Sequence, residues 1–391
     1  MLLDGDRLHN KALYSTPLTV DRYTQELPNG APEDIGATVL ANGDIAICIF
    51  AQNAKTVKIT CATSGKRVRD IALQGDGQGQ FRGVLTYDRF FTGPANVLAF
   101  YDDQLVLDPY LPIFWTNNRP HNYLEIPDEG NDAFLIRDVP HGAVTHQLFW
   151  AKPMGNWERC LVYTPPQYMK NSAEYPVLYL LNGGTDNETS WEYAGRLSAI
   201  MDNLIAAGEA EPMIVVMPNS MLRAEGKVSM VRDGAFDTML LEDCIPFIEA
   251  NYRVKTQKWD RAIAGLSMGA YMTCDIALGH SDSFGYVGTF TACMTHNEEH
   301  IQLAPGVVRP YREFLKQVSP DAFSKLFKVY FRSTTEQEDH FEFFEADDRL
   351  MAQAGYDQLP CCHRTVYSEN TSKWNSWRMG LRDYAKLLFK K

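Results

Sequence analysis

The chain changes its pattern of hydrophobic and polar positions part of the way along. Between Gly36 and Asp108, apolar runs of strand length alternate with polar turns such as Asn42–Gly43, and no helical periodicity interrupts them. The predicted strands are Gly36–Leu40, Ile45–Phe50, Val57–Cys61, Phe81–Tyr87 and Val97–Tyr101. This pattern predicts an all-β sandwich.

The stretch from Trp115 to Asp132 is rich in Asn, Pro and Asp and predicts a linker. After it, strand-like runs alternate with helix-like runs, and Pro176–Leu181 is continuously apolar, as in strands buried on both faces of a parallel sheet. The other expected strands are Ala143–Trp150, Glu158–Tyr163, Met213–Met217, Arg261–Ala264 and Lys328–Arg332, and the expected helices are Gly195–Ala206, Leu240–Asn251 and Ala270–Leu278. This alternation predicts an α/β fold with a mainly parallel sheet and an active site at the carboxyl ends of its strands.

Length agrees with this division, because single cores usually stop growing at about 250–300 residues and the chain has 391. We expect an N-terminal arm at residues 1–30, the β-sandwich at 31–125, a linker at 126–138 and the α/β domain at 139–391.

The composition of the chain argues against some classes of binding partner. The chain has 37 Lys and Arg against 49 Asp and Glu, a net charge of −12, which argues against nucleic acid or an anionic membrane surface as a partner. No apolar run approaches the roughly 18 residues that span a bilayer. The start of the chain lacks a signal-peptide pattern and the eight cysteines are scattered, so we expect a cytoplasmic protein with reduced thiols, although a processed secreted chain would look the same. No metal-ligand spacing or nucleotide motif is present, so no cofactor is expected, and homo-oligomerisation is left open.

The strongest candidate for chemistry is Gly265-Leu-Ser-Met-Gly269, which lies between an apolar strand-like run and a helix-like run. A G-x-S-x-G sequence in this context forms a tight strand-to-helix turn that holds its serine, here Ser267, in strained geometry. The helix then directs its positive end at the site, and the amide of Met268 can stabilise an oxyanion. The alternative is a chance match at an ordinary strand-helix junction.

Several segments, in order along the chain, resemble the esterase family that includes esterase D and the feruloyl and acetyl-xylan esterases. They are Tyr163–Tyr168, Tyr175–Gly184, Trp191, Asp202–Ile205, Pro212–Asn219 and Gly265–Ala270. The resemblance covers about residues 139–391 and implies an α/β-hydrolase fold in which a serine attacks an ester, a histidine takes the proton and an acid orients the histidine. It implies Ser267 as the nucleophile and a small-molecule or carbohydrate ester as the substrate.

The first domain resembles the early-set, immunoglobulin-like modules that precede the catalytic domain of many carbohydrate-active enzymes, on the strand-turn-strand pattern of Val97–Pro109. Aromatic side chains that could bind sugar, or alternatively fill the core or the domain interface, are Tyr87, Phe90, Phe91 and Tyr110.

The chain departs from the family in its oxyanion loop, which usually reads His-Gly-Gly and here reads Asn182-Gly183-Gly184. The glycines still allow the backbone to approach the substrate. An amide near Gly184 or Thr185 could join Met268 in the oxyanion hole, and Asn182 could support the loop through hydrogen bonds.

A second departure affects the base. The family reads Gly-His-x-Trp-x-x-Trp-Arg near its carboxyl end, and here Trp374, Trp377 and Arg378 match while Ser372 holds the histidine position. A hydroxyl of ordinary acidity cannot accept the proton of Ser267 near neutral pH as an imidazole can. Groups that could replace the base are His296, His300, His340, His363 and Lys373, although each histidine alone is more often a surface residue.

The acid position of the family falls on Glu338, with Asp339 next to it; the alternative is that both are solvated loop carboxylates. Trp374 and Trp191, together with Asn182, are expected to contact the substrate, whereas Trp377 could instead pack the last helix onto the sheet. Two hypotheses therefore remain: a serine esterase with an altered or relocated base, and a catalytically impaired pseudo-esterase that binds a carbohydrate or acyl ligand.

Overall fold

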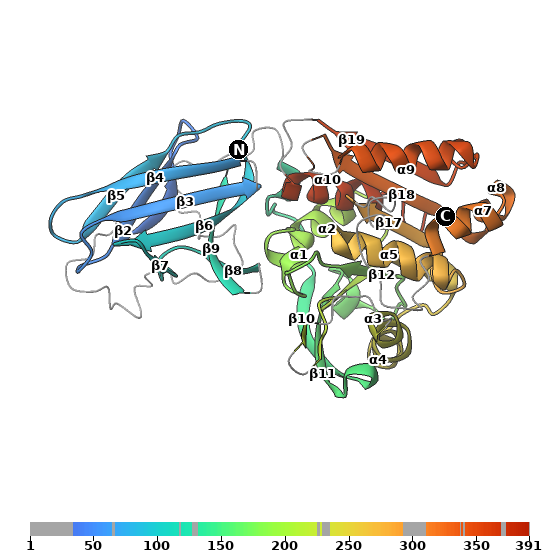
Figure 1. The fold of residues 1–391 in the computed structure, drawn as a ribbon. Coiled ribbons are helices and arrows are strands. Elements are labelled where there is room, and N and C mark those ends of the chain that lie inside the picture. Colours follow the sequence, from blue (N-terminus) through green and yellow to red (C-terminus); the bar gives the residue numbers. More distant parts are fainter. Residues whose placement is uncertain are drawn as a thin grey trace. The chain divides into compact units, whose positions relative to one another are not determined.

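The computed structural model describes residues 34–64, 67–116, 119–126, 132–224, 227–228, 235–291, 310–336, 338, 341–368 and 373–390 (Figure 1). The chain divides into two compact units, one running to Ile136 and the other made mainly of the chain from Arg137 onward. The expected N-terminal arm lies outside the described residues.

The first unit is built from antiparallel strands. Its elements are β1 (Gly36–Val39), β2 (Ile45–Phe50), β3 (Val57–Ser64), β4 (Arg67–Gly75), β5 (Gln80–Leu85), β6 (Gly93–Tyr101), β7 (Gln104–Val106), β8 (Ile113–Thr116), β9 (Arg119–Ile126) and the 3-10 turn η1 (Asp132–Phe134). Within the described residues the strand order is β1-β2-β5-β4-β3-β6-β9-β8, with β7 also paired to β6. The core includes Ile47 and Phe81 from one half of this sheet and Ile59 and Val97 from the other, so the sheet closes around a single apolar core. The all-β expectation is confirmed, and the likeness to immunoglobulin-like modules stays a prediction.

The expected linker between Trp115 and Asp132 is wrong where β8 and β9 lie. Leu124 and Ile126 of β9 are buried in the core, and Pro120 lies near the start of the strand. The amide side chain of Asn122, which suggested a loop, is buried and donates to the carbonyl oxygen of Asp108 over 2.8 Å. Of the aromatic residues considered for sugar binding, Phe91 is part of the core and Phe90 is exposed.

The second unit carries a large mixed sheet. Its strands are β10 (Ala143–Ala151), β11 (Asn156–Thr164), β12 (Val177–Leu181), β13 (Ile214–Pro218), β16 (Arg261–Leu266), β17 (Tyr286–Phe290), β18 (Val329–Thr335) and β19 (Cys362–Tyr367), with a separate short hairpin of β14 (Arg223–Ala224) and β15 (Lys227–Val228). In the part of the chain that the structure describes, the order is β10-β11-β13-β12-β16-β17-β18-β19. The pairs from β13 to β19 are parallel, whereas β10 and β11 pair antiparallel at one edge.

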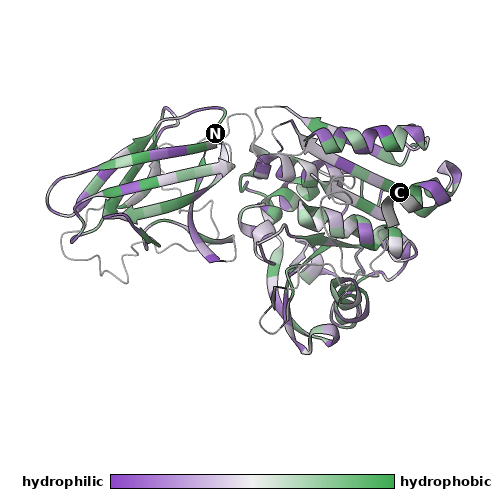
Figure 2. Ribbon diagram, viewed as in Figure 1, coloured by the Kyte–Doolittle hydropathy of each residue, from purple (hydrophilic) through white to green (hydrophobic). Residues whose placement is uncertain are grey.

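Helices connect these strands and cover the sheet. They are α1 (Ser190–Tyr193), α2 (Leu197–Ala206), α3 (Ala235–Met239), the π-helical η4 (Leu240–Cys244), α4 (Ile245–Asn251), α5 (Met268–Gly279), α7 (Pro310–Gln317), α8 (Pro320–Leu326), α9 (Phe341–Gln353) and α10 (Lys373–Ala385), with 3-10 turns η2 (Lys152–Met154), η3 (Tyr168–Lys170) and η5 (Lys258–Asp260). The purple and green segments that alternate along α9 in Figure 2 are those of an amphipathic helix. Among the helices that the structure describes, none combines the length and the hydrophobicity of a membrane-spanning segment.

Every residue of β12, β13, β17 and β18 is buried, as the continuous apolar runs predict for strands covered on both faces. The predicted α/β fold with a mainly parallel sheet is confirmed. The carboxyl ends of these strands therefore lie at one edge, where the candidate site is found.

Candidate active site

Ser267 occupies the sharp turn between β16 and α5. Its backbone has φ 49° and ψ −117°, a conformation that costs a non-glycine residue on the order of 1–3 kcal/mol. The amide of Ser267 donates a 2.9 Å hydrogen bond to the carbonyl oxygen of Phe290 at the end of β17, which holds the turn against the neighbouring strand. The strained strand-turn-helix geometry is present, and the role of Ser267 as nucleophile stays a prediction.

The two glycines around Ser267 are required by close backbone packing. A Cβ atom on Gly265 would lie 2.4 Å from the carbonyl oxygen of Gly269. A Cβ atom on Gly269 would in turn lie 2.4 Å from the carbonyl oxygen of Asn182, on the loop that follows β12. Any side chain at either position would force these backbones apart, so the G-x-S-x-G spacing has a steric cause.

Backbone strain occurs in three loops at this edge of the sheet. Thr185 (φ 69°), Ser267 and Thr291 (φ 61°) are non-glycine residues in positive-φ conformations. They follow β12, β16 and β17, which are neighbours in the sheet. Strain of this kind persists where the surroundings enforce it and clusters at functional sites. This cluster marks the edge independently of the sequence motif.

Backbone amides lie beside the serine in positions suited to an oxyanion. Gly184 abuts the first residue of α5, since a Cβ atom on Gly184 would lie 3.7 Å from Cβ of Met268. Among the described residues, neither the amide of Gly184 nor that of Met268 donates a hydrogen bond. The Met268 amide also lies at the positive end of a 12-residue helix. Both amides are therefore available to an anionic oxygen, and their pairing as an oxyanion hole stays a prediction.

Asn182 fixes the loop that carries Gly184. Its side chain, 1% exposed, donates to the Gly183 carbonyl oxygen over 2.9 Å and accepts from the Ser220 amide over 3.0 Å. Its own carbonyl oxygen accepts a hydrogen bond from the Ser220 hydroxyl over 3.1 Å. These bonds join the loops after β12 and β13. The expected loop support is thus visible, whereas contact of Asn182 with substrate stays a prediction that its burial argues against.

Trp191 is also buried, with 1% of its surface exposed. Its indole donates to the carbonyl oxygen of Leu181 over 2.9 Å and meets the ring of Phe290 edge-on with centroids 5.7 Å apart. These contacts attach α1 to the ends of β12 and β17. The predicted contact of Trp191 with substrate is likewise disfavoured by burial, and Trp374, at the start of α10, is partly buried.

The expected acid and base positions follow the last two strands. Glu338 lies three residues beyond β18, is partly buried, and donates its amide to the carbonyl oxygen of Thr335 over 3.0 Å. Ser372 falls between β19 and α10, but it lies outside the described residues, as do Asp339, His296, His300 and His340. The order nucleophile, acid, base thus falls after β16, β18 and β19, and the roles stay predictions.

Within the described part of the chain, the hydroxyl of Ser267 forms no hydrogen bond with any side chain. His363, one of the candidate bases, lies in β19. It pairs with Phe331 of β18, and the strand register places both level with Ala264 in β16. Since β19 is three strands from β16, His363 is displaced sideways by about 14 Å at roughly 4.8 Å per strand. This position argues against His363 as the base in the described conformation. Lys373, the first residue of α10, is partly buried.

Two residues of the expected Trp-x-x-Trp-Arg motif anchor α10. The indole of Trp377 donates to the hydroxyl of Thr291 over 3.0 Å, and Arg378, 1% exposed, donates through Nε to the carbonyl oxygen of Ala194 over 2.8 Å. The helix is thereby tied to the segments that follow β17 and β12. Sequence reasoning did not identify Thr291 or Ala194, because nothing local to either residue indicates a contact with a helix so far along the chain.

Glu192 is a buried carboxyl that the sequence did not single out. Its carboxylate oxygens accept hydrogen bonds from the hydroxyl of Ser198 at 2.9 and 2.8 Å, and burial raises its pKa from 4.5 to about 7. Glu192 lies in α1, next to Trp191.

Sequence patterns also did not predict a histidine-carboxylate pair formed by His141 and Asp202. Nδ1 of His141 lies 2.9 Å from the buried carboxylate of Asp202, which also accepts a hydrogen bond from the hydroxyl of Tyr163 over 2.6 Å. The strand register places this cluster at the amino end of β16, near Arg261, and therefore at the edge of the sheet away from Ser267. The pair secures the start of β10 to α2.

The strand order and the strained serine turn define an α/β-hydrolase. The chain belongs to the esterase family described as "Putative esterase", whose model matches residues 152–383. A curated relative, the endo-1,4-beta-xylanase/feruloyl esterase of Xylanibacter ruminicola, is 32% identical over 273 residues, which are 67% of this chain and 36% of that protein. The chain therefore spans about a third of that relative's length.

Solved structures give the same fold. The CE1 ferulic acid esterase of Anaeromyces mucronatus matches with a TM-score of 0.56 at 20% identity, over 66% of this chain and 95% of that one. The enterobactin esterase FES of Shigella flexneri matches with a TM-score of 0.61 at 13% identity, over 89% of this chain and 94% of that one. At these identities the likeness concerns the fold alone.

Proposed function

We propose that the chain hydrolyses carboxylic esters through Ser267, acting on feruloyl or acetyl esters of carbohydrates or on a related small ester. The observation that carries the proposal is the strained Ser267 beside two backbone amides, of Met268 and Gly184, that donate no hydrogen bond within the described residues. Membership of the esterase family and the name of the Xylanibacter relative support the choice of substrate.

In the proposed reaction, Oγ of Ser267 attacks the ester carbonyl carbon and loses its proton to a base. The carbonyl oxygen becomes an oxyanion that accepts hydrogen bonds from the two amides. The carbon-oxygen bond to the alcohol then breaks, and the alcohol leaves with the proton. Water hydrolyses the acyl-enzyme in a second passage through the same states, releasing the carboxylic acid and regenerating Ser267.

The base is proposed to be altered or relocated, because Ser372 stands where the family has histidine. A serine hydroxyl remains protonated near neutral pH and cannot replace imidazole in this step. A side chain from elsewhere at the carboxyl edge of the sheet would then accept the proton.

A second candidate function is a pseudo-esterase that binds an acyl or carbohydrate ligand and hydrolyses it poorly. Two observations favour it: the Ser372 substitution, and the absence of a hydrogen bond from any described histidine to Ser267. An intact nucleophile and oxyanion hole without a base would still leave weak catalysis over water.

The deciding experiment measures hydrolysis of an aryl acetate and of methyl ferulate by the natural chain, Ser267→Ala and Ser372→His. Ser324→Ala, which removes an exposed hydroxyl on α8, is the matched control. For an esterase with a relocated base we expect turnover on the order of 1 per second or more, lost in Ser267→Ala and kept in the control.

For a pseudo-esterase, the natural chain would be no faster than Ser267→Ala, and Ser372→His would raise the rate. The double variant Ser267→Ala with Ser372→His must cancel this gain, because the new imidazole acts through the serine. Equal rates in all these variants would overturn both functions.

A further inference from the structure

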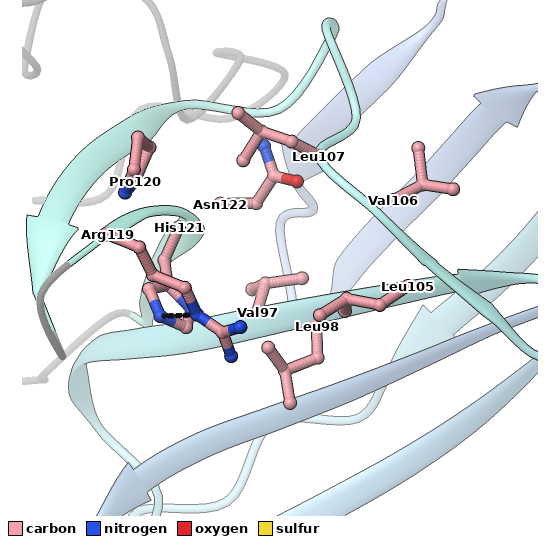
Figure 3. A pocket seen from close by; sticks show the side chains of 9 residues that line it. All are labelled: Val97, Leu98, Leu105, Val106, Leu107, Arg119, Pro120, His121 and Asn122. Atoms are coloured by element: carbon pink, nitrogen blue, oxygen red, sulfur yellow. Dashed lines mark hydrogen bonds between the residues drawn. The ribbon is translucent and has the colours of Figure 1, made fainter.

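The first unit holds a small pocket that the proposed ester hydrolysis does not use (Figure 3). Its volume is about 150 Å³, room for roughly five water molecules at about 30 Å³ each. Pockets for drug-sized ligands begin at about 300 Å³, so this one suits a smaller molecule. Its lining comes from β6, β7 and β9 and from the residue that follows β7.

The pocket exists because β6 changes its pairing partner along its length. From Gly93 to Val97, β6 pairs with β9, and from Ala99 to Tyr101 it pairs with β7. The two partners separate at Leu98, which opens the sheet and leaves a hollow between β7 and β9. The hollow is therefore part of the strand topology and not a chance gap between side chains.

The walls of the pocket are mainly aliphatic. Val97 is buried below it, whereas Leu105 and Leu107 are 48% and 45% exposed at its rim. Exposed leucines that border a concave surface gain free energy when a ligand removes them from water, at about 25 cal/mol per Å² of apolar area. The pocket therefore favours a ligand with an apolar body.

Among the polar side chains that line the pocket, the guanidinium of Arg119 is a cation that can bind an anionic ligand. Arg119 donates through Nε to Nε2 of His121 over 3.1 Å, and Figure 3 shows the guanidinium beside this imidazole and turned toward Val97 and Leu98. His121 is only 5% exposed, so burial holds its imidazole, the acceptor of this hydrogen bond, in place. The buried Asn122 is fully engaged with Asp108, to which it donates over 2.8 Å and from which it accepts over 2.7 Å.

His121 keeps the guanidinium in place as a neutral acceptor. Burial, followed by the charge of Arg119, lowers the pKa of His121 below its usual 6.5, so the imidazole is neutral at neutral pH and can accept through Nε2. Among the described residues, Arg119 forms no ion pair with a carboxylate, and its two terminal NH2 groups remain free to bind one. A guanidinium presents these groups in the geometry that a carboxylate accepts through two parallel hydrogen bonds.

We propose that this pocket binds a small monocarboxylate with a compact apolar body, such as an aromatic acid of benzoate size. The carboxylate pairs with the terminal nitrogens of Arg119, and the apolar body lies against Val97, Leu98 and the rim leucines. A neutral sugar fits less well, because the lining contains no Trp, Tyr or Phe ring on which a pyranose could stack. Inorganic phosphate would pair with the guanidinium of Arg119 but would leave the apolar walls of the pocket exposed to water. The proposal does not depend on the function of Ser267.

The test is calorimetric titration of the full chain carrying Ser267→Ala, which removes turnover. Benzoate is the probe, and benzamide, acetate, phosphate and xylose are comparison ligands. We expect benzoate to bind with a Kd of roughly 1 mM or tighter and benzamide to bind at least about tenfold more weakly, because it lacks the charge-assisted pair.

Variants assign the binding to the pocket. Arg119→Gln should weaken benzoate binding at least about tenfold. Arg89→Gln, at another exposed arginine of the same unit, should change it less than about twofold, because a remote charge is screened by salt. Leu107→Asp, at the exposed rim, should also weaken binding by repelling the anion, and unchanged melting temperatures would show that these variants fold.

The proposal is overturned by the absence of benzoate binding up to roughly 10 mM, or by equal binding of benzoate and benzamide. It is equally overturned if Arg119→Gln or Leu107→Asp binds benzoate like the parent, since the ligand would then occupy another site. Tighter binding of xylose or phosphate than of benzoate would assign the pocket to a different ligand class.

Discussion

At the scale of single residues, the candidate site depends on how one backbone segment is held. Gly184 can direct its amide at an oxyanion only if the loop after β12 keeps its shape, and the side chain of Asn182 bonds to both sides of that loop. The family's usual histidine at this position is replaced here by an amide, which can donate and accept at once. Asn182 therefore supports the loop that carries Gly184.

Asn182→Ala is predicted to damage catalysis through this loop. Removing the side chain leaves the buried amide of Ser220 and the carbonyl oxygen of Gly183 without their partner, which costs about 1–3 kcal/mol for each unsatisfied buried group. Because the oxyanion amide then shifts, kcat on the aryl acetate should fall more than about tenfold with little change in KM.

Asn156→Ala, at an exposed hairpin position, is the control and should leave both kcat and stability unchanged. If Asn182→Ala were destabilised but kept a normal kcat, the side chain of Asn182 would not be needed to position the loop for catalysis, and the prediction would be wrong.

At the scale of elements, the site is set by the crossing of β16, α5 and the loop after β12. Gly265 and Gly269 let three backbones approach within contact distance, and α10 is tied to the ends of β12 and β17 through Trp377 and Arg378. The same packing that strains Ser267 leaves α5 no freedom to relax it. A bulkier residue at the crossing would move the helix and the serine together.

Gly269→Ala and Gly279→Ala provide a matched test, since both glycines lie in α5. A Cβ atom at 269 would lie 2.4 Å from the carbonyl oxygen of Asn182, whereas one at 279 would meet nothing within 4 Å. Gly269→Ala should lower the free energy of unfolding by about 1–3 kcal/mol, the usual cost of overpacking, and should reduce ester hydrolysis.

Gly279→Ala should be neutral or stabilising by up to about 1 kcal/mol, because alanine is the better helix former. Urea unfolding of both variants measures the difference. Equal effects of the two substitutions would mean that α5 tolerates displacement at its start, contrary to the steric argument.

The elements that sequence patterns predicted are those whose cause is local. The strained turn at Ser267 and the buried run Pro176–Leu181 follow from residue spacing within one segment, and both are present in the structure. Strand β9 was missed because Pro120 and Asn122 resemble loop residues, yet Asn122 finds its partner at Asp108. Such a contact has no signature near either residue.

The candidate site shows the same limit. The contact of Trp377 with Thr291 and that of Arg378 with Ala194 join segments that are distant along the chain. The motif letters indicated that these side chains matter, but their roles as anchors of α10 appear only in the folded protein. The same holds for the burial of Trp191, which the sequence alone left free to face a substrate.

At the scale of the whole molecule, a chain with a net charge of −12 buries several carboxylates in its second unit. Several have a basic partner: Arg159 lies 3.2 Å from Glu188, and Lys152 lies 3.0 Å from Asp243. Glu192 differs, because burial is the main cause of its raised pKa and outweighs the hydrogen bonds that it accepts from Ser198. The folded protein therefore favours the protonated form of Glu192.

This preference predicts how stability depends on pH. Between about 4.5 and about 7 the folded chain binds more protons at Glu192 than the unfolded chain does, so the free energy of unfolding falls as pH rises through this window. The contribution is fully present below pH 4.5 and is lost above pH 7. A shift of this size corresponds to about 3 kcal/mol. Glu192→Gln, which is neutral at every pH, should remove this dependence.

Urea unfolding at pH 5 and pH 8 measures the effect, followed by tryptophan fluorescence because six of the seven tryptophans lie beyond Ile136. Other titrating groups cancel when each variant is compared with the natural chain at the same pH. Glu192→Gln should gain stability relative to the natural chain at pH 8 but not at pH 5. Glu242→Gln, at an exposed position of η4, should show no such difference. If the two substitutions behaved alike, Glu192 would be ionised in the folded protein at pH 5, and burial at α1 would not govern its charge.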